Sequence, residues 1–438
     1  MKTLLLLLFL FFVGANAGCL ITPDSNGHVD IPDGTTEIPA GAFEDCYELV
    51  SVHLPDSLTS IGRNAFRSLP LFDSINIHEG VTSISEIAFF NVTSLTQKIT
   101  TFWEGGKTLI WSGCDPVIDS DIKIIAGAYG GCLTLTSIEI PWNVHTLGYA
   151  AFYDSGLTSI YIPDTVKELG NSLLSKCPDL TTIHFGPSPQ ILKIPDWFVR
   201  GSLSLTYVVI PDSVTEIGYA AFYETSITSI DLPNYLKIID DYAFSKTKLQ
   251  SITIPENVNS LGIWSLGENP DIHTVVLGNG IDEIPYAFVY NCPSLRNINI
   301  PDTVNLIGDW SFASTGLQTI NIPNSVFEIG IASFKETGLT GVIIPNSVRT
   351  IGESSFLNLP ALDTVIIGNG VKTIGNFAFD DCVSLKYLTL GNNVKTIGYA
   401  AFRKTSIVDL VIPDSTTEIG DYAFYDQFYL EFLTLAFD

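Results

Sequence analysis

Oxygen-bearing side chains recur along the chain at a spacing that could bring them together. An Asp, Asn or Glu follows a short apolar run and a proline or glycine, as at Asp212, Asn324 and Asn346. Successive copies are mostly 22 or 23 residues apart, so stacked copies would bring these side chains within about 5 Å of one another. Such a row could bind Ca²⁺, or its members could start turns by bonding to the backbone two residues on. No calcium-loop spacing is present, so we expect turns and no metal site.

Catalytic arrangements are missing from the sequence. It contains no Gly-x-Ser-x-Gly, no His-Glu-x-x-His and no phosphate-binding glycine-rich loop. The six histidines are scattered, and we expect His53 and His184 to be ordinary outward-pointing surface residues. The sequence therefore predicts a protein that is not an enzyme and that holds no cofactor.

Most of the seven cysteines occupy one position of a repeat. Cys46, Cys132, Cys177, Cys292 and Cys382 stand where other copies carry a threonine, such as Thr225. A position shared by Cys and Thr indicates packing rather than metal binding. The odd number leaves at least one thiol unpaired in a secreted chain, and we expect a disulfide between Cys19 and Cys46 at the N-terminal coil.

A repeat of 22 or 23 residues positions all of these side chains. One copy runs from Ile210 to Asp231 and begins again at Leu232. Within a copy, the apolar–polar alternation of 249–254 predicts a strand with one buried face, which a proline ends. The following Val-x-x-Ile-Gly-x-x-Ala-Phe predicts a compact return segment, whose glycine we expect to supply a backbone angle that other residues resist. A fixed period of this length predicts a solenoid, in which neighbouring coils bury a continuous core.

The repeat is irregular at about 97–130, within a 63-residue gap between Ile77 and Ile140. We expect degenerate coils there, with Ile122–Tyr129 as a shortened return segment. The irregularity has two interpretations. It is either sequence drift or a bulge that marks a binding site.

These copies resemble the BspA-like (treponemal-type) leucine-rich repeat. The matching pattern is Leu-x-x-Ile-x-Ile-Pro-x-Ser-Val-x-x-Ile-Gly-x-x-Ala-Phe, at 205–222, 249–262, 317–334 and 339–356. The resemblance implies leucine-rich-repeat-like coils, with a parallel β-sheet on the concave face and short return segments on the convex face. It also implies a surface or secreted protein of the kind that includes adhesins, without naming a ligand.

Charge restricts the partners. The formal net charge is −26 and the isoelectric point is about 4.4. An acidic chain is a poor candidate for binding nucleic acid or an anionic membrane, which both require clustered Lys and Arg. The acidity either keeps a repetitive β-protein soluble and monomeric or attracts cations or a basic partner.

The ends of the chain give further expectations. Residues 1–17 read as a signal peptide, with Lys2 before a ten-residue apolar run that is too short to span a bilayer. We predict a cap at 18–30, a single solenoid at 31–438, no transmembrane segment, and a location that is secreted or peripheral to the cell surface. Asn91 begins the sequon Asn-Val-Thr and is a candidate glycosylation site. The last residues still read as a strand, which predicts end-to-end association or a docked partner.

The outward-pointing strand residues form the candidate binding site. Few of them are charged, and several are apolar, so the sheet face could engage a protein or glycan, for example on a host cell or in extracellular matrix. Strand propensity alone would also favour such residues. The alternative function is a structural, self-associating surface or matrix component. The candidate residues are Tyr161, His184, Tyr207, Val209, Val276, Asn299, Asn321, Ile343, Ile366, Tyr387 and Val411.

Overall fold

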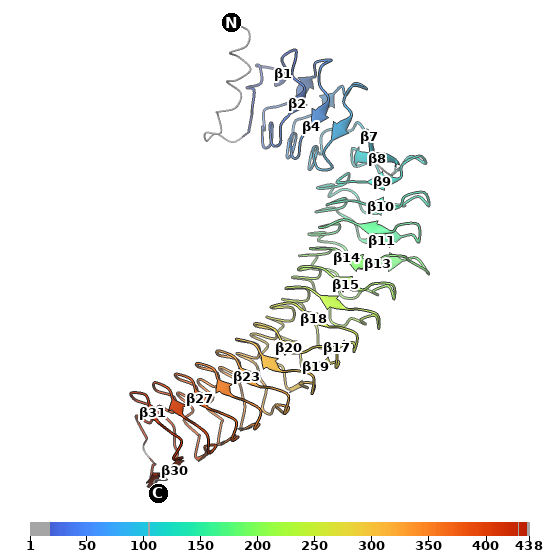
Figure 1. Ribbon diagram of the computed structural model, residues 1–438. Helices are drawn as coiled ribbons and strands as arrows, with labels where there is room; N and C mark the ends of the chain where they lie inside the picture. The colour runs from blue at the N-terminus through green and yellow to red at the C-terminus, as the bar shows by residue number, and fades with distance from the viewer. Residues whose placement is uncertain (1–17, 104–105, 428, 436–438) are drawn as a thin grey trace.

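The chain winds into a stack of coils with short strands, and the stack follows an arc (Figure 1). The computed structural model describes residues 18–103, 106–427 and 429–435, and no helix occurs in these ranges. The predicted signal peptide lies outside the described residues. The predicted fold class, a leucine-rich-repeat-like solenoid of parallel strands, is confirmed.

The longer strands of the coils form a first ladder. Strand β17 (Ser251–Ile254) pairs in parallel with β19 (Thr274–Leu277), so that Ile252 lies beside Val275 and Ile254 beside Leu277. These apolar residues are buried, while the residues between them point outward. The ladder continues in β1 (His28–Asp30), β3 (Ser51–His53), β5 (Ser74–Ile75), β11 (Ser159–Ile162), β13 (Thr182–Phe185), β21 (Asn297–Ile298), β24 (Gly341–Ile344), β26 (Thr364–Ile367), β28 (Tyr387–Thr389), β30 (Asp409–Ile412) and β32 (Phe432–Leu435).

The return segments form a second ladder of two-residue strands. Strand β25 (Thr350–Ile351) pairs in parallel with β23 (Glu328–Ile329) and β27 (Thr373–Ile374), with the isoleucine buried in each. The other members are β2 (Glu37–Ile38), β4 (Ser60–Ile61), β6 (Ser83–Ile84), β9 (Ile124–Ile125), β10 (Thr146–Leu147), β12 (Glu168–Leu169), β14 (Lys193–Ile194), β15 (Glu216–Ile217), β16 (Ile238–Ile239), β18 (Ser260–Leu261), β20 (Glu283–Ile284), β22 (Leu306–Ile307), β29 (Thr396–Ile397) and β31 (Glu418–Ile419).

Most return segments end in a phenylalanine, and many of these rings stack on the ring of the next coil. Phe334 lies 5.0 Å from Phe312 and 5.1 Å from Phe356, measured between ring centroids, and all three rings are fully buried. Stacked aromatic pairs add about 0.5–1.5 kcal/mol to the burial of their surface. Together with the two ladders, this column closes the core along the solenoid.

The glycine before the Ala-Phe pair has a different role from the predicted one. Gly330 and Gly352 are absent from the positive-φ residues, whereas Ala332 and Glu336 have φ values of 52° and 58°. A Cβ atom on Gly352 would lie 2.6 Å from the carbonyl carbon of Gly330 in the preceding coil. The expectation of a special backbone angle is therefore wrong, and the glycine allows two backbones to approach closely.

The irregular region contains an antiparallel hairpin. Strands β7 (Ile99–Trp103) and β8 (Gly106–Trp111) pair with each other, and β8 then pairs in parallel with β9. This hairpin takes the place of a degenerate coil, while the predicted return segment is present as β9 followed by Tyr129, which stacks on Phe152 at 5.4 Å. The solenoid thus accommodates the insertion without losing its second ladder from β9 onward.

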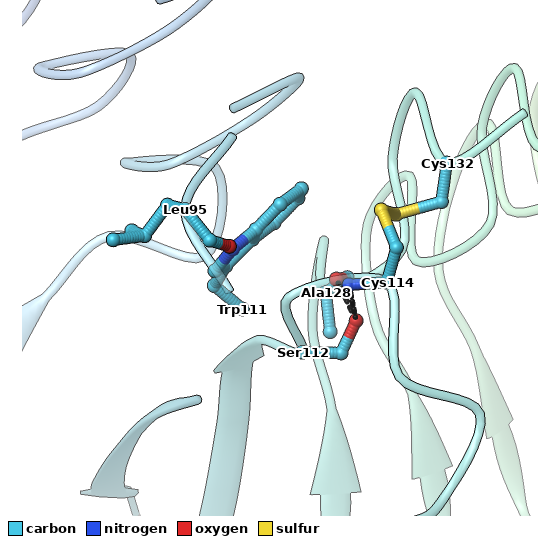
Figure 2. Close-up of a disulfide and its surroundings, with 6 residues drawn as sticks. All are labelled: Leu95, Trp111, Ser112, Cys114, Ala128 and Cys132. Carbon is cyan, nitrogen blue, oxygen red and sulfur yellow. Dashed lines mark hydrogen bonds between the residues drawn. A yellow bond between two sulfur atoms is a disulfide. The ribbon is translucent and has the colours of Figure 1, made fainter. Parts of the chain in front are cut away.

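A second disulfide lies beside the hairpin. Cys114 is bonded to Cys132, with Cα atoms 5.5 Å apart (Figure 2). The indole of Trp111 is buried and donates a hydrogen bond to the carbonyl of Leu95 at 2.7 Å. The repeat position of Cys132 had indicated packing alone, whereas the structure shows that Cys132 also forms a disulfide. Cys19 and Cys46 form a disulfide with Cα atoms 5.0 Å apart.

The remaining cysteines are free and buried. The thiols of Cys177 and Cys382 lie 3.0 and 3.1 Å from the carbonyl oxygens of Phe152 and Phe356. Where a threonine takes this position, its hydroxyl also donates to a phenylalanine carbonyl, as in Thr225 to Phe222 at 2.9 Å. The position accepts both residue types because each fills the core and places a donor near a carbonyl.

Candidate binding face

The outward residues of the first ladder form one continuous surface, which we call the strand face. In β11 the exposed Ser159 and Tyr161 alternate with the buried Ile160 and Ile162. Because side chains of a strand alternate between its two sides, every coil contributes two outward positions to this face. All of the predicted candidate residues are exposed there.

The structure divides the candidates among four sections of the ladder, since hydrogen bonding between the longer strands is interrupted. Tyr161 lies directly beside His184 in the β11–β13 pair, and Val209 forms an isolated bridge with Asp231. Val276 belongs to β19 of the third section. Ile343, Ile366, Tyr387 and Val411 lie together on the last section, β24-β26-β28-β30-β32.

The last section carries an apolar patch, which we define as Ile343, Ile366, Tyr387 and Val411. Ile343 and Ile366 are direct neighbours on β24 and β26, with exposed fractions of 65% and 41%. Tyr387 and Val411 on the next two strands are exposed by 61% and 54%. Asp409, paired with Tyr387, is a charged residue within this section. The patch therefore exposes apolar surface to water, and Asp409 is the one acidic residue within its four strands, β24, β26, β28 and β30.

Asn299 is bonded within the solenoid. Its side-chain amide donates to the carbonyl of Leu277 at 2.9 Å, and its carbonyl oxygen accepts the Leu277 amide at 2.8 Å. These two bonds replace backbone pairing between neighbouring coils where β21 has already ended. The main role of this candidate is thus to join coils.

An open pocket interrupts the strand face between His184 and Val209. It has a volume of about 450 Å³ and is lined by His184, Pro187 and Val209, among others. The coil between Phe185 and Ile210 is longer than its neighbours, and its Pro187-Ser188-Pro189 segment separates the strands. The extra residues thus create a hollow on an otherwise filled surface.

The row of Asp and Asn side chains bonds from coil to coil. The side-chain oxygen of Asn346 accepts the Asn369 amide at 2.7 Å, and that of Asn369 accepts the Asn392 amide at 2.8 Å. At these positions the expected bond to the residue's own turn is replaced by one to the next coil. Across the described residues, no group of three or more His, Cys, Asp or Glu side chains is placed to hold a metal ion.

Asn91, the candidate glycosylation site, is exposed at a corner of its coil. Its φ angle is 59°, a left-handed conformation that asparagine tolerates better than most residues. The backbone amide of Asn91 donates to Gly130 at 3.2 Å, across the hairpin insertion. Glycosylation of this asparagine stays a prediction.

The two ladders and the repeated return segment define a protein of the leucine-rich-repeat class. The profile described as "BspA type Leucine rich repeat region (6 copies)" matches residues 23–103, 117–223, 193–317 and 305–431. The chain therefore belongs to the BspA-type leucine-rich repeat family. No helix in the described part of the chain is long and apolar enough to cross a membrane.

Several solved structures match the chain at low sequence identity, and one of them shares its fold. A leucine-rich repeat protein from Bacteroides ovatus is 21% identical, with a TM-score of 0.52, over 83% of this chain and 92% of that one. A leucine-rich cell surface protein from Faecalibacterium prausnitzii is 18% identical over 95% and 89%, with a TM-score of 0.30. The pneumococcal vaccine antigen PcpA is 16% identical over 94% and 90%, with a TM-score of 0.37. No curated protein matches the sequence.

Proposed function

We propose that this protein is an extracellular binding protein that engages a protein or glycan partner through the apolar patch on its strand face. The observation that carries the proposal is the exposed pair Ile343 and Ile366 beside Tyr387 and Val411. Contiguous exposed apolar surface is costly in water, and it often marks an interaction site in a monomeric protein. The predicted signal peptide and the family of the chain support a location outside the cell, where host cells and extracellular matrix offer such partners.

The test compares binding by three proteins. Purified residues 18–438 are titrated against host cells, immobilised extracellular matrix proteins and a glycan array. The first variant carries Ile343→Glu and Ile366→Glu, which place two charges in the patch. The matched control carries Leu133→Glu and Val383→Glu, because these residues are similarly exposed, at 61% and 50%, but lie in turns away from the strands.

We expect saturable binding by the wild type and by the control, and at least tenfold weaker binding by the patch variant. A hot-spot residue contributes at least about 2 kcal/mol, which corresponds to more than tenfold in affinity. Binding that survives both patch substitutions would refute this site. Absence of binding to every surface would refute the function.

A further inference from the structure

A row of equivalent positions, several of them basic, runs along the edge of the second ladder. It consists of the residue immediately before each second-ladder strand, together with Lys107 on β8, and we call it the return row. Backbone bonds place its members side by side: the Lys372 amide donates to Arg349 and the Lys395 amide donates to Lys372, both at 2.9 Å. Its members are Thr36, Thr59, Thr82, Lys107, Lys123, His145, Lys167, Leu192, Thr215, Lys237, Asn259, Asp282, Asn305, Phe327, Arg349, Lys372, Lys395 and Thr417.

The return row concentrates positive charge in an acidic protein. The chain has 21 Lys and Arg residues against 47 Asp and Glu. Seven of those 21 basic residues stand in the row, whereas Asp282 is its single acidic member. Basic residues are thus enriched along a line where their overall abundance would place about one.

Three consecutive members form no ion pair, although Glu328 and Glu418 lie beside the outer two on the neighbouring strands. Arg349, Lys372 and Lys395 are exposed, and their side chains form no hydrogen bond or ion pair with any residue in the described part of the chain. Their neighbours in β25, β27 and β29 are threonines. Elsewhere in the row Lys107 contacts Asp121 at 2.9 Å and Lys123 lies over the ring of Trp142. Lys167 and Lys237 also have no side-chain partner among the described residues, but Leu192 and Thr215 separate them in the row.

Like charges on adjacent strands repel each other. Neighbouring strands are about 4.8 Å apart, and like charges directly opposite each other destabilise a sheet. Nothing in the core requires basic residues here, because the same position holds Thr215, Asn259 and Asn305 in other coils. An anionic ligand that spans three coils would remove this repulsion.

We propose that Arg349, Lys372 and Lys395 bind a linear anionic polysaccharide, a chain of sulfated or carboxylated sugars. Neighbouring members of the row are about 4.8 Å apart, comparable with the length of one pyranose ring, so successive cations can meet anionic groups on successive sugars. Phe327, the preceding member of the row, is 44% exposed and offers an aromatic surface to a sugar ring. The threonines Thr350, Thr373 and Thr396 add hydroxyl groups beside the cations.

Charge spacing favours a polysaccharide over nucleic acid. Duplex DNA carries one charge per about 1.7 Å of its axis, which three cations at strand spacing cannot neutralise. The proposal is independent of the apolar patch, because Ile343 belongs to the first ladder and Arg349 to the edge of the second.

The experiment measures binding of residues 18–438 to heparin and to the less densely charged chondroitin sulfate, with uncharged dextran, polyglutamate and duplex DNA as competitors. The row variant carries Arg349→Gln, Lys372→Gln and Lys395→Gln. The matched control carries Lys246→Gln, Lys335→Gln and Lys404→Gln, which remove the same charge from residues that already contact acidic side chains. Circular dichroism checks that both variants are folded.

We expect the wild type and the control to bind heparin, and the row variant to bind it roughly tenfold more weakly, since each exposed charge contact contributes about twofold or more. Binding should weaken as salt is raised. No binding by the wild type at low salt, or equal binding by the row variant, would overturn the site. Equal competition by DNA or polyglutamate would overturn the polysaccharide as its ligand. The patch variant should bind heparin normally, so this result is separable from the proposed function.

Discussion

Three buried serines should destabilise the solenoid. Ser311, Ser333 and Ser355 are fully buried, and their hydroxyl oxygens have no hydrogen-bond partner among the described residues. They precede the stacked rings of Phe312, Phe334 and Phe356 in three successive coils. Other coils hold alanine there, such as the fully buried Ala378 and Ala401, so a methyl group fits the same space.

The expected gain follows from the cost of an unpaired hydroxyl. A buried hydroxyl without a partner costs about 1–3 kcal/mol relative to water, and alanine loses little side-chain entropy on burial. Each Ser→Ala substitution should therefore raise the free energy of unfolding by about 1 kcal/mol, and the triple variant by about 3 kcal/mol. Effects in adjacent coils add through neighbouring interfaces in a repeat protein.

Ser245→Ala is the matched control. Ser245 is also buried, but its hydroxyl donates to the Gly267 carbonyl at 2.9 Å. Removing this bond should lower the free energy of unfolding by about 1 kcal/mol. Urea unfolding followed by circular dichroism, with hydrogen exchange of 305–360 to localise the effect, measures both changes. A triple variant that is no more stable than the wild type would show that the three hydroxyls do have partners.

Two further predictions concern ionisation. Burial raises the pKa of Glu86 above its ordinary value of 4.5, although the carboxylate accepts a bond from the Tyr149 amide; the folded state therefore holds this proton more tightly, and stability falls as the pH rises above 4.5. The Glu86→Gln variant should have a higher free energy of unfolding than the wild type at pH 7, and the difference should disappear below pH 4.5. Urea unfolding at a series of acidic pH values measures this difference. A difference that stays constant with pH would contradict the prediction. Burial also raises the pKa of Cys177 to about 11, and of Cys292 and Cys382 to about 12. Iodoacetamide at pH 8 should thus leave the native protein unmodified and add three groups after unfolding without reductant, as counted by mass spectrometry; native labelling would refute the buried placement.

The first ladder was predictable because its signal is local. Alternation of apolar and polar residues, as in 249–254, directly indicates one buried face, and the same pattern recurs in register. The second ladder was read only as a compact return segment, since a strand of two residues, such as β25, is too short for any periodicity. Its pairing is specified by the neighbouring coils and not by its own sequence.

The hairpin and its disulfide depended on contacts outside the repeat. Cys114 has no equivalent in other coils, so its partner could not be found by comparing copies, whereas Cys132 occupied a repeated position that suggested packing alone. The antiparallel pairing of β7 with β8 breaks the parallel order that the period predicted. The patch residues could be predicted because apolar–polar alternation shows which side chains of a strand point outward. The division of the first ladder into separate sheets, which places Tyr161 and Ile343 in different sheets, depends on strand pairing and could not be predicted in this way.

The return row shows why net charge alone does not decide the partners of a solenoid. Arg349, Lys372 and Lys395 are 23 residues apart in sequence and read as isolated cations, but stacking makes them neighbours. At physiological salt a bound chain responds mainly to charges within about 8 Å. Over that distance the row is lined by threonines at its centre and by Glu328 and Glu418 at its two ends, and the −26 total of the whole chain is largely screened. An acidic solenoid can therefore reject nucleic acid and still bind a sparsely charged polyanion along one of its rows.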